Sequence, residues 1–348
     1  MAKNFSGKQW QCVVGVRDQS ATAIGSGAGT FVNNSNLFME LDTINGIAFD
    51  GGLQSSEAVK SGRRMLNDED MVQHYGSGTW TWDFDYLVKN ELLLQQLLGL
   101  VYNGDYHSGD NFTVPVAPVF EDLSHGAGGT VDRTADILLL APEDLPSGTD
   151  SGLRNADHRL HSAVLNTLTL TMDMGSDAGR LRASGQFMSG YSPLINDSGA
   201  TGVTTASNFE KGLFDMDTRT IGGMTTVTTK AFNITISNPA TRVGFQGASG
   251  NCDGYVRGGA IDITGSVTVK YDGDTEDLLE ANYLGGAGNT IRILLEEGSG
   301  WSIDVPAARL TGFNKDYAED GMFVELPFKA TAGADAGATG GALIVKAT

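Results

Sequence analysis

The chain is best interpreted outward from residues 78–104, GTWTWDFDYLVKNELLLQQLLGLVYNG. In its first part, Trp80, Trp82 and Phe84 alternate with threonine and aspartate, so the aromatic side chains share one face of a strand. The leucines that follow form a stripe wider than one amphipathic face, which is typical of a helix covered on most sides. The stretch therefore predicts a strand that runs directly into the only long helix of the chain.

The predicted helix covers residues 85–102, with Asp85 as its N-terminal cap. Leu87, Leu94, Leu98 and Val101 lie close to one stripe and are the expected packing residues. Eighteen helical residues span about 27 Å, which is enough to cross one face of a sheet.

A second stretch, residues 265–285, repeats this order of features as GSVTVKYDGDTEDLLEANYLG. A glycine is followed by an alternating strand pattern, an acidic turn and a short helical segment that contains leucines. The acidic residues suit a first helical turn, because the helix dipole favours negative charge there. We interpret the two stretches as copies of one supersecondary unit.

Composition favours a mainly β protein. The 348 residues include 47 glycines, and alternating segments such as 164–174 and 180–189 predict a hairpin. A second hairpin is predicted at residues 38–49, around the Asn45-Gly46 turn. Chains of this kind usually form sandwiches or barrels.

The net charge of −19 argues against a surface that binds nucleic acid or an anionic membrane, since both require clustered basic residues. The most apolar window has about 10 residues, which is shorter than a membrane span. No secretory signal is visible at the N-terminus, so we expect synthesis in a cytoplasm.

No constellation in the sequence supports catalysis, and we expect no enzyme, metal or cofactor. Asp157, His158 and His161 could be metal ligands, but a loop that enters a strand explains them more simply. The two cysteines, Cys12 and Cys252, are too few for a disulfide framework or a zinc site and are expected to be buried thiols.

The chain resembles the tail tube proteins of long-tailed (siphovirus-type) phages in the order of its elements. These elements are the two units, the hairpin at 164–189, the alternating FNITISN at 232–238 and the strands IRILLEE and MFVELPFKA. The match is to their longer form, in which the tube fold occurs twice, and it extends over residues 10–330. The two units would be residues 1–160 and 161–348, with strands exchanged between them.

The resemblance implies two β-sandwich or half-barrel units, each with a flanking helix, that form a β-barrel ring on oligomerisation. Three chains would give a trimeric ring with pseudo-sixfold symmetry, a hexamer being the alternative, and stacked rings would form a tube in the virion tail. DNA would pass through an acidic lumen during ejection without specific binding. A tape measure protein and a tail terminator are the other implied partners.

Asp83, Asp173 and Asp262 are the candidates for the lumen wall, because each lies on an alternating strand and would be costly to bury in a core. The alternative function is a virion or cell-surface β-sandwich module that binds a carbohydrate or a receptor. Its aromatic groove would require Trp80, Trp82 and Trp301, although core positions for these residues are favoured by the alternation around them.

Overall fold

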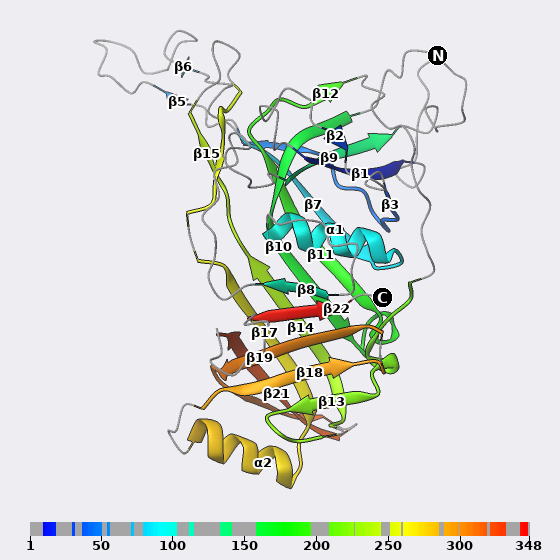
Figure 1. Cartoon of the computed structure of the whole chain (residues 1–348), viewed down its shortest axis with the longest axis vertical. Coiled ribbons are helices and arrows are strands. Elements are labelled where there is room, and N and C mark those ends of the chain that lie inside the picture. The colour runs from blue at the N-terminus through cyan, green and yellow to red at the C-terminus, as the bar shows by residue number, and fades with distance from the viewer. Residues whose placement is uncertain are drawn as a thin grey trace, which may run out of the picture.

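The computed structural model describes residues 10–18, 30–31, 37–50, 54–55, 71–72, 79–102, 111–114, 133–140, 158–195, 209–225, 227–244, 251–258, 260–284, 289–298, 300–318, 321–331 and 342–346. It is mainly β, as the composition predicts, with long strands through the middle and a helix packed in front of them (Figure 1). The sequence also predicts a long exposed loop at 50–70, a linker at 141–152 and a glycine-rich tail at 331–341, and these three segments lie almost entirely outside the described residues.

One antiparallel sheet, here called the long sheet, organises the molecule. Its order is β7 (Thr79–Leu87), β11 (Leu181–Ser189), β10 (His158–Asp173), β14 (Thr229–Ser237), β17 (Asp262–Lys270) and β21 (Gly321–Ala330). The short strand β4 (Ala48–Asp50) extends it beyond β7, and β20 (Asn314–Ala318) extends it beyond β21. Strands of both predicted units therefore share one sheet.

Two further sheets complete the layers. One contains β13 (Thr218–Ile221), β18 (Ile291–Glu296), β19 (Ser302–Leu310), β22 (Leu343–Lys346) and β8 (Asn111–Val114). The other contains β12 (Leu194–Ile195), the first part of β10, β9 (Arg133–Leu140), β1 (Gln11–Asp18), β2 (Thr30–Phe31) and β3 (Leu37–Met39).

Two small pairs stand apart from these sheets. They are β5 (Gln54–Ser55) with β6 (Met71–Val72), and β15 (Thr241–Val243) with β16 (Gly254–Val256). The end of β19 also pairs with β21 and joins the second sheet to the long sheet. Among the described strands no series of pairings returns to its start, so the sheets of one chain are open.

The helix α1 (Glu91–Tyr102) is shorter than predicted, and the expected cap at residue 85 is wrong. Strand β7 continues to Leu87 because Tyr86 still faces the core while Asp85 is exposed and paired with Arg182. The cap is Asn90, whose Oδ1 accepts a hydrogen bond from the Leu93 N–H at 3.3 Å. Leu87 therefore belongs to the strand and not to the helix.

The predicted broad burial of the helix is confirmed. Leu94, Leu98 and Val101 have no exposed surface, and neighbouring leucines on other sides of α1 are also buried. All three belong to the main core, together with Trp82 and the aromatic residues of the long sheet. No helix among the described residues has the length and apolarity needed to cross a membrane.

The second copy of the strand-and-helix order is also present. Strand β17 leads into α2 (Gly273–Leu279), whose cap Asp272 accepts a hydrogen bond from the Thr275 N–H at 3.1 Å, and the π-helix η7 (Glu280–Leu284) continues it. The single-turn 3-10 helix η5 (Asp177–Gly179) lies between β10 and β11, and η6 (Leu213–Asp215) precedes β13. Whether the chain is a duplication divided at residue 160 stays a prediction, and that position falls inside β10.

One of the two predicted hairpins is confirmed. Strands β10 and β11 pair across the turn at 174–180. The hairpin at 38–49 is wrong, because β3 pairs with β1 and β4 pairs with β7, so the chain changes sheets at Asn45. There the Trp82 indole N–H donates to the Asn45 carbonyl, and the Asn45 amide donates to the Asp83 carbonyl, each at 2.9 Å.

Candidate functional site: the polar face of the long sheet

The long sheet has one buried face and one polar face. Along β7 the inward residues Trp82, Phe84 and Tyr86 are buried, whereas the outward Asp83 and Asp85 are exposed. The other five strands keep the same alternation in register. The outward positions, here called the polar face, are residues 79, 81, 83, 85 and 87; 182, 184, 186 and 188; 167, 169, 171 and 173; 231, 233, 235 and 237; 262, 264, 266, 268 and 270; and 323, 325, 327 and 329.

Hydroxyl and amide side chains make up half of the polar face, and several are bonded across strands. The hydroxyls of Thr169 and Thr235 lie 2.9 Å apart. The Asn233 amide donates to the Ser266 hydroxyl at 2.7 Å, and its oxygen accepts from the Ser266 N–H at 3.1 Å. These cross-strand bonds join β10 to β14 and β14 to β17 in the middle of the face without a charged group.

All three aspartates predicted for a lumen wall lie on the polar face. The Asp83 carboxylate accepts a hydrogen bond from the Gln186 amide at 2.9 Å. Asp173 accepts from the Gly175 N–H at 2.8 Å, and Asp262 forms an ion pair with Lys329 at 2.6 Å. Topology thus brings the three together on one surface of the sheet, although each carboxylate already has a partner.

Arg182 is the main cation of the polar face and was not identified from sequence. Its guanidinium contacts the carboxylates of Asp177 at 2.6 Å, Asp85 at 3.0 Å and Asp42 at 3.5 Å. The hydrogen bond to Asp85 is the main cause that raises the pKa of Arg182 above its usual value. An isolated arginine in an alternating strand carries no sequence signal that its partners lie 97 and 140 positions away.

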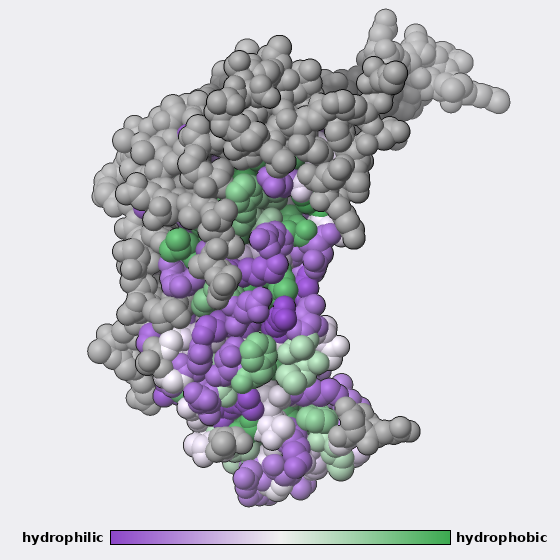
Figure 2. Space-filling model, turned by 90° about the vertical axis from the view of Figure 1, so that its right-hand side faces the viewer, coloured by the Kyte–Doolittle hydropathy of each residue, from purple (hydrophilic) through white to green (hydrophobic). Residues whose placement is uncertain are grey.

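The polar face is close to neutral. Its outward positions hold five carboxylates and three cations; the carboxylates are Asp83, Asp85, Asp173, Asp262 and Glu325, and the cations are Arg182, Lys270 and Lys329. The net charge of −19 of the chain is therefore not concentrated on this face. Viewed from the side, the coloured surface is mostly hydrophilic, and hydrophobic residues form separate patches (Figure 2).

An open pocket of about 480 Å³ lies where the polar face meets β20. Asp173, Lys230, Lys315, Asp316 and Glu325 contribute to its lining. Three carboxylates and two ammonium groups share this lining, so the pocket prefers neither phosphate nor a cation by charge alone.

Both lateral edges of the long sheet are open among the described residues. At one edge β4 pairs only with β7, and at the other β20 pairs only with β21. Each edge leaves backbone N–H and C=O groups available for pairing with a further strand.

The opposite face of the sheet is held by α1 and a buried arginine. The Asn238 amide donates to the carbonyl of Val101 at 3.0 Å. The Arg257 guanidinium donates to the carbonyls of Leu100 at 3.2 Å and Leu165 at 3.0 Å, and also to that of Asn238. The end of the helix is therefore bonded to the sheet, so the helix and the polar face lie on opposite sides of it.

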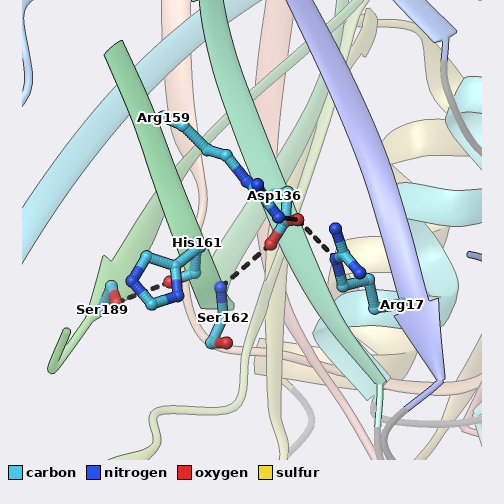
Figure 3. A network of polar contacts seen from close by, with 6 residues as sticks. All are labelled: Arg17, Asp136, Arg159, His161, Ser162 and Ser189. Carbon is cyan, nitrogen blue, oxygen red and sulfur yellow. Dashed lines mark hydrogen bonds and ion pairs between the residues drawn. The ribbon is translucent and has the colours of Figure 1, made fainter. Parts of the chain in front are cut away.

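A buried ionic cluster holds β10 where it passes from one sheet to another (Figure 3). Asp136 of β9 has no exposed surface and accepts from Arg17 at 2.5 Å, from Arg159 at 2.6 Å and from the Ser162 N–H at 3.1 Å. Ser162 has a φ of +50° and lies at the bulge in β10. The carboxylate thus satisfies an irregular backbone position and two arginines together.

Around this cluster, the hydroxyl of Tyr255 donates to the Ser162 carbonyl at 2.9 Å and accepts from the Gly190 N–H at 2.8 Å. His161 packs against the Tyr191 ring, with centroids 5.4 Å apart, and its carbonyl accepts from the Ser189 hydroxyl at 2.8 Å. Burial lowers the pKa of His161, although the nearby Asp136 opposes this. The aspartate in the apolar run ADILLL was a possible sequence signal, but its partners were not predictable.

The residues of the alternative hypotheses do not converge. His158 is exposed and packs edge-on against Trp10, whereas His161 is buried, and Asp157 lies outside the described residues. Within the described ranges no group of three or more His, Cys, Asp or Glu residues could hold a metal ion. Trp82 and Trp301 are in the core and Trp80 packs against it, so these three do not line an exposed groove.

Both cysteines are buried free thiols, as predicted. Burial raises the pKa of the Cys12 thiol and also that of the Cys252 thiol. Neither thiol is therefore primed as a nucleophile.

A comparison with curated proteins finds no match. A comparison with family models matches residues 13–339 to the model described as phage tail tube protein. This match covers nearly all of the long sheet, both helices and both open edges. The chain therefore belongs to the phage tail tube protein family.

Proposed function

We propose that this protein forms rings that stack into a hollow tail tube, and that the polar face of the long sheet lines the lumen. The observation that carries the proposal is a sheet with one polar face, one buried face and two open edges, in a chain of the tail tube family. Pairing of β4 of one chain with β20 of the next would close the open sheets into a barrel, which removes their exposed edges.

Strand number favours three chains in a ring over six. The long sheet with β4 and β20 contributes eight strands per chain. At the usual strand spacing and tilt, three chains would form a barrel roughly 48 Å across between backbones, and six chains one roughly 96 Å across. The smaller barrel already leaves room for a DNA duplex, so we propose a trimeric ring with pseudo-sixfold symmetry.

The lumen proposed here is hydroxyl-rich and weakly acidic. Asp83, Asp173 and Asp262 would face the passing DNA beside threonine and serine, and the negative charge of the chain as a whole would oppose phosphate binding. DNA would then move through the tube during ejection without a specific binding site. In this role the protein carries out no reaction and uses no cofactor.

The assembled tube would be part of the virion tail, after synthesis of the chain in the host cytoplasm. A tape measure protein inside the tube and a terminator at its end are the further partners expected. The alternative, a carbohydrate- or receptor-binding module, has no specific support, because the tryptophans it requires belong to the core or pack against it.

Electron microscopy of the purified chain tests the proposal. We expect rings or tubes whose class averages show three chains per ring with six similar lobes. A chain that stays monomeric at high concentration would contradict the conduit, and six complete chains per ring would contradict the trimer. Mass photometry of isolated rings provides an independent count.

A further inference from the structure

In the described part of the chain, the large hydrophobic side chains with exposed fractions of 38% to 70% lie toward the two ends of β10. Among the described residues there are seven, and none lies at a position of the polar face. A random scatter of surface hydrophobics is normal, whereas segregation into two groups indicates interaction surfaces.

The first group, here called the turn end, comprises Met174, Phe214, Tyr317 and Met322, with exposed fractions of 42% to 70%. Met174 directly follows β10, and Phe214 lies in η6, next to the bridge between Arg180 and Gly212. Tyr317 and Met322 are cross-strand partners near the tip of the β20–β21 hairpin.

These four residues lie at the same end of the strands. The backbone N–H of Met174 donates to the carbonyl of Lys230 at the start of β14, and Lys230 lies over the ring of Phe323, the neighbour of Met322. The turn end thus extends from the β10–β11 turn across the sheet to the β20 edge.

The second group, here called the ribbon end, comprises Leu194, Val243 and Val256. Leu194 pairs with Arg159 at the beginning of β10, so β10 separates it from Met174. Val243 and Val256 belong to the β15–β16 ribbon, which follows β14 and precedes β17 at that same end. The sixteen residues of β10, roughly 50 Å of extended chain, lie between Leu194 and Met174.

We propose that the turn end of one ring binds the ribbon end of the next ring, so that the two patches are the stacking surfaces of the tube. This inference rests on the proposed function: if the lateral edges close the ring, the strand ends face along the tube axis. Two different patches at opposite ends of one molecule form a heterologous, head-to-tail contact, and such contacts repeat without closing. The occupant of each patch is therefore another copy of this chain.

Two variants test the proposal, each with substitutions at one end. Phe214→Asp with Tyr317→Asp changes the turn end, and Leu194→Asp with Val256→Asp changes the ribbon end. A control, Thr290→Asp with Thr311→Asp, adds the same charge at two exposed positions that belong to neither group. Circular dichroism and thermal melting establish that each variant folds, as expected for substitutions at exposed positions.

Each end variant is expected to form rings that fail to stack, with ring–ring affinity reduced about tenfold or more, while the control forms tubes of normal length. Mixing the two variants leaves one intact turn end and one intact ribbon end, so stacked pairs of rings form but no tubes. Tubes of normal length from either variant, or mixtures without ring pairs, overturn the inference. Failure of the unmodified chain to form rings overturns the proposed function instead, so the two failures are distinguishable.

Discussion

Asp136 shows how much a single residue can determine in this fold. Its carboxylate bonds to Arg17, Arg159 and the backbone of Ser162, so residues from β1, β9 and β10 meet at one fully buried group. A buried ion pair adds little compared with a hydrophobic core, but removal of one partner leaves the remaining charges uncompensated. The residue therefore specifies how β10 bends from one sheet into the next.

Replacing Asp136 by Asn should lower the free energy of unfolding by about 3–5 kcal/mol, because both arginines lose their buried carboxylate. Urea denaturation measures this loss. As a control, a triple variant with Asp136→Leu, Arg17→Met and Arg159→Met should be less destabilised than Asp136→Asn. An Asp136→Asn variant as stable as the parent would show that the cluster does not hold β10.

His161 should make the protein sensitive to mild acid. Its pKa is lowered in the folded state, mainly by burial, so the unfolded chain binds more protons near and below its usual value of about 6.5. The stabilisation by neutral His161 is present above that pH and is lost as the pH falls through it. The facing charged groups Asp136, Arg159 and Arg17 modulate the shift.

Comparison of Tm at pH 7.5 and pH 5.5 checks this expectation. His161→Gln should reduce the difference between the two Tm values, whereas His158→Gln, at an exposed position on the same strand, should leave it unchanged. Equal differences in all three proteins would exclude His161 as the source of acid sensitivity.

At the scale of the element, the strands of the long sheet depend on close backbone contact at two glycines. Gly185 lies opposite Phe84, and Gly265 lies opposite Phe328. A Cβ atom at Gly265 would lie 2.3 Å from the Asn233 carbonyl oxygen and 2.7 Å from the Phe328 ring. The aromatic rings thus occupy the space that a side chain would need, and only glycine allows this packing.

Gly265→Ala should therefore destabilise the protein by about 1–3 kcal/mol, because the backbone or the Phe328 ring must move. Gly258→Ala is the matched control, since nothing lies within 4 Å of its added Cβ and its stability should be unchanged or slightly raised. Chemical denaturation of both variants gives the comparison. Equal stabilities would mean that β14 and β21 adjust to the methyl group without cost.

At the scale of the whole molecule, the charges are arranged so that one face is nearly neutral although the chain carries −19. A wall of hydroxyls with paired charges neither attracts nor strongly repels phosphate, and the remaining negative charge acts at longer range. This arrangement suits a conduit more than a binding protein, because transit of DNA requires that no phosphate is held.

Adding cations to the polar face should convert the tube into a DNA-binding surface. Thr167→Lys with Thr235→Lys places two ammonium groups per chain on that face, and we expect tubes that retain duplex DNA in a salt-dependent manner. Thr290→Lys with Thr311→Lys adds equal charge elsewhere and should retain much less. Fluorescence anisotropy with assembled tubes measures retention, and equal retention by both variants would show that the polar face does not line the lumen.

Local pattern was sufficient for the parts of the fold that depend on neighbouring residues. Alternation, helical periodicity and turn chemistry predict the mainly β class, the β10–β11 hairpin, the broad burial of α1 and the acidic first turn of α2. They also predict the outward orientation of Asp83, Asp173 and Asp262. The family was also recognisable, because the order of strands and glycines extends over nearly the whole chain.

Tertiary structure decided what depends on residues distant in sequence. Four features involve partners that lie tens of positions away or more. They are the pairing of β3 and β4 with different strands, the extension of β7 to Leu87, the contacts of Arg182 and the cluster at Asp136. Alternation specifies which side of a strand a residue takes but not which strand lies beside it. The sequence by itself therefore determined the elements and their polar and apolar sides, and only packing of the sheets decided which of those sides became one continuous surface.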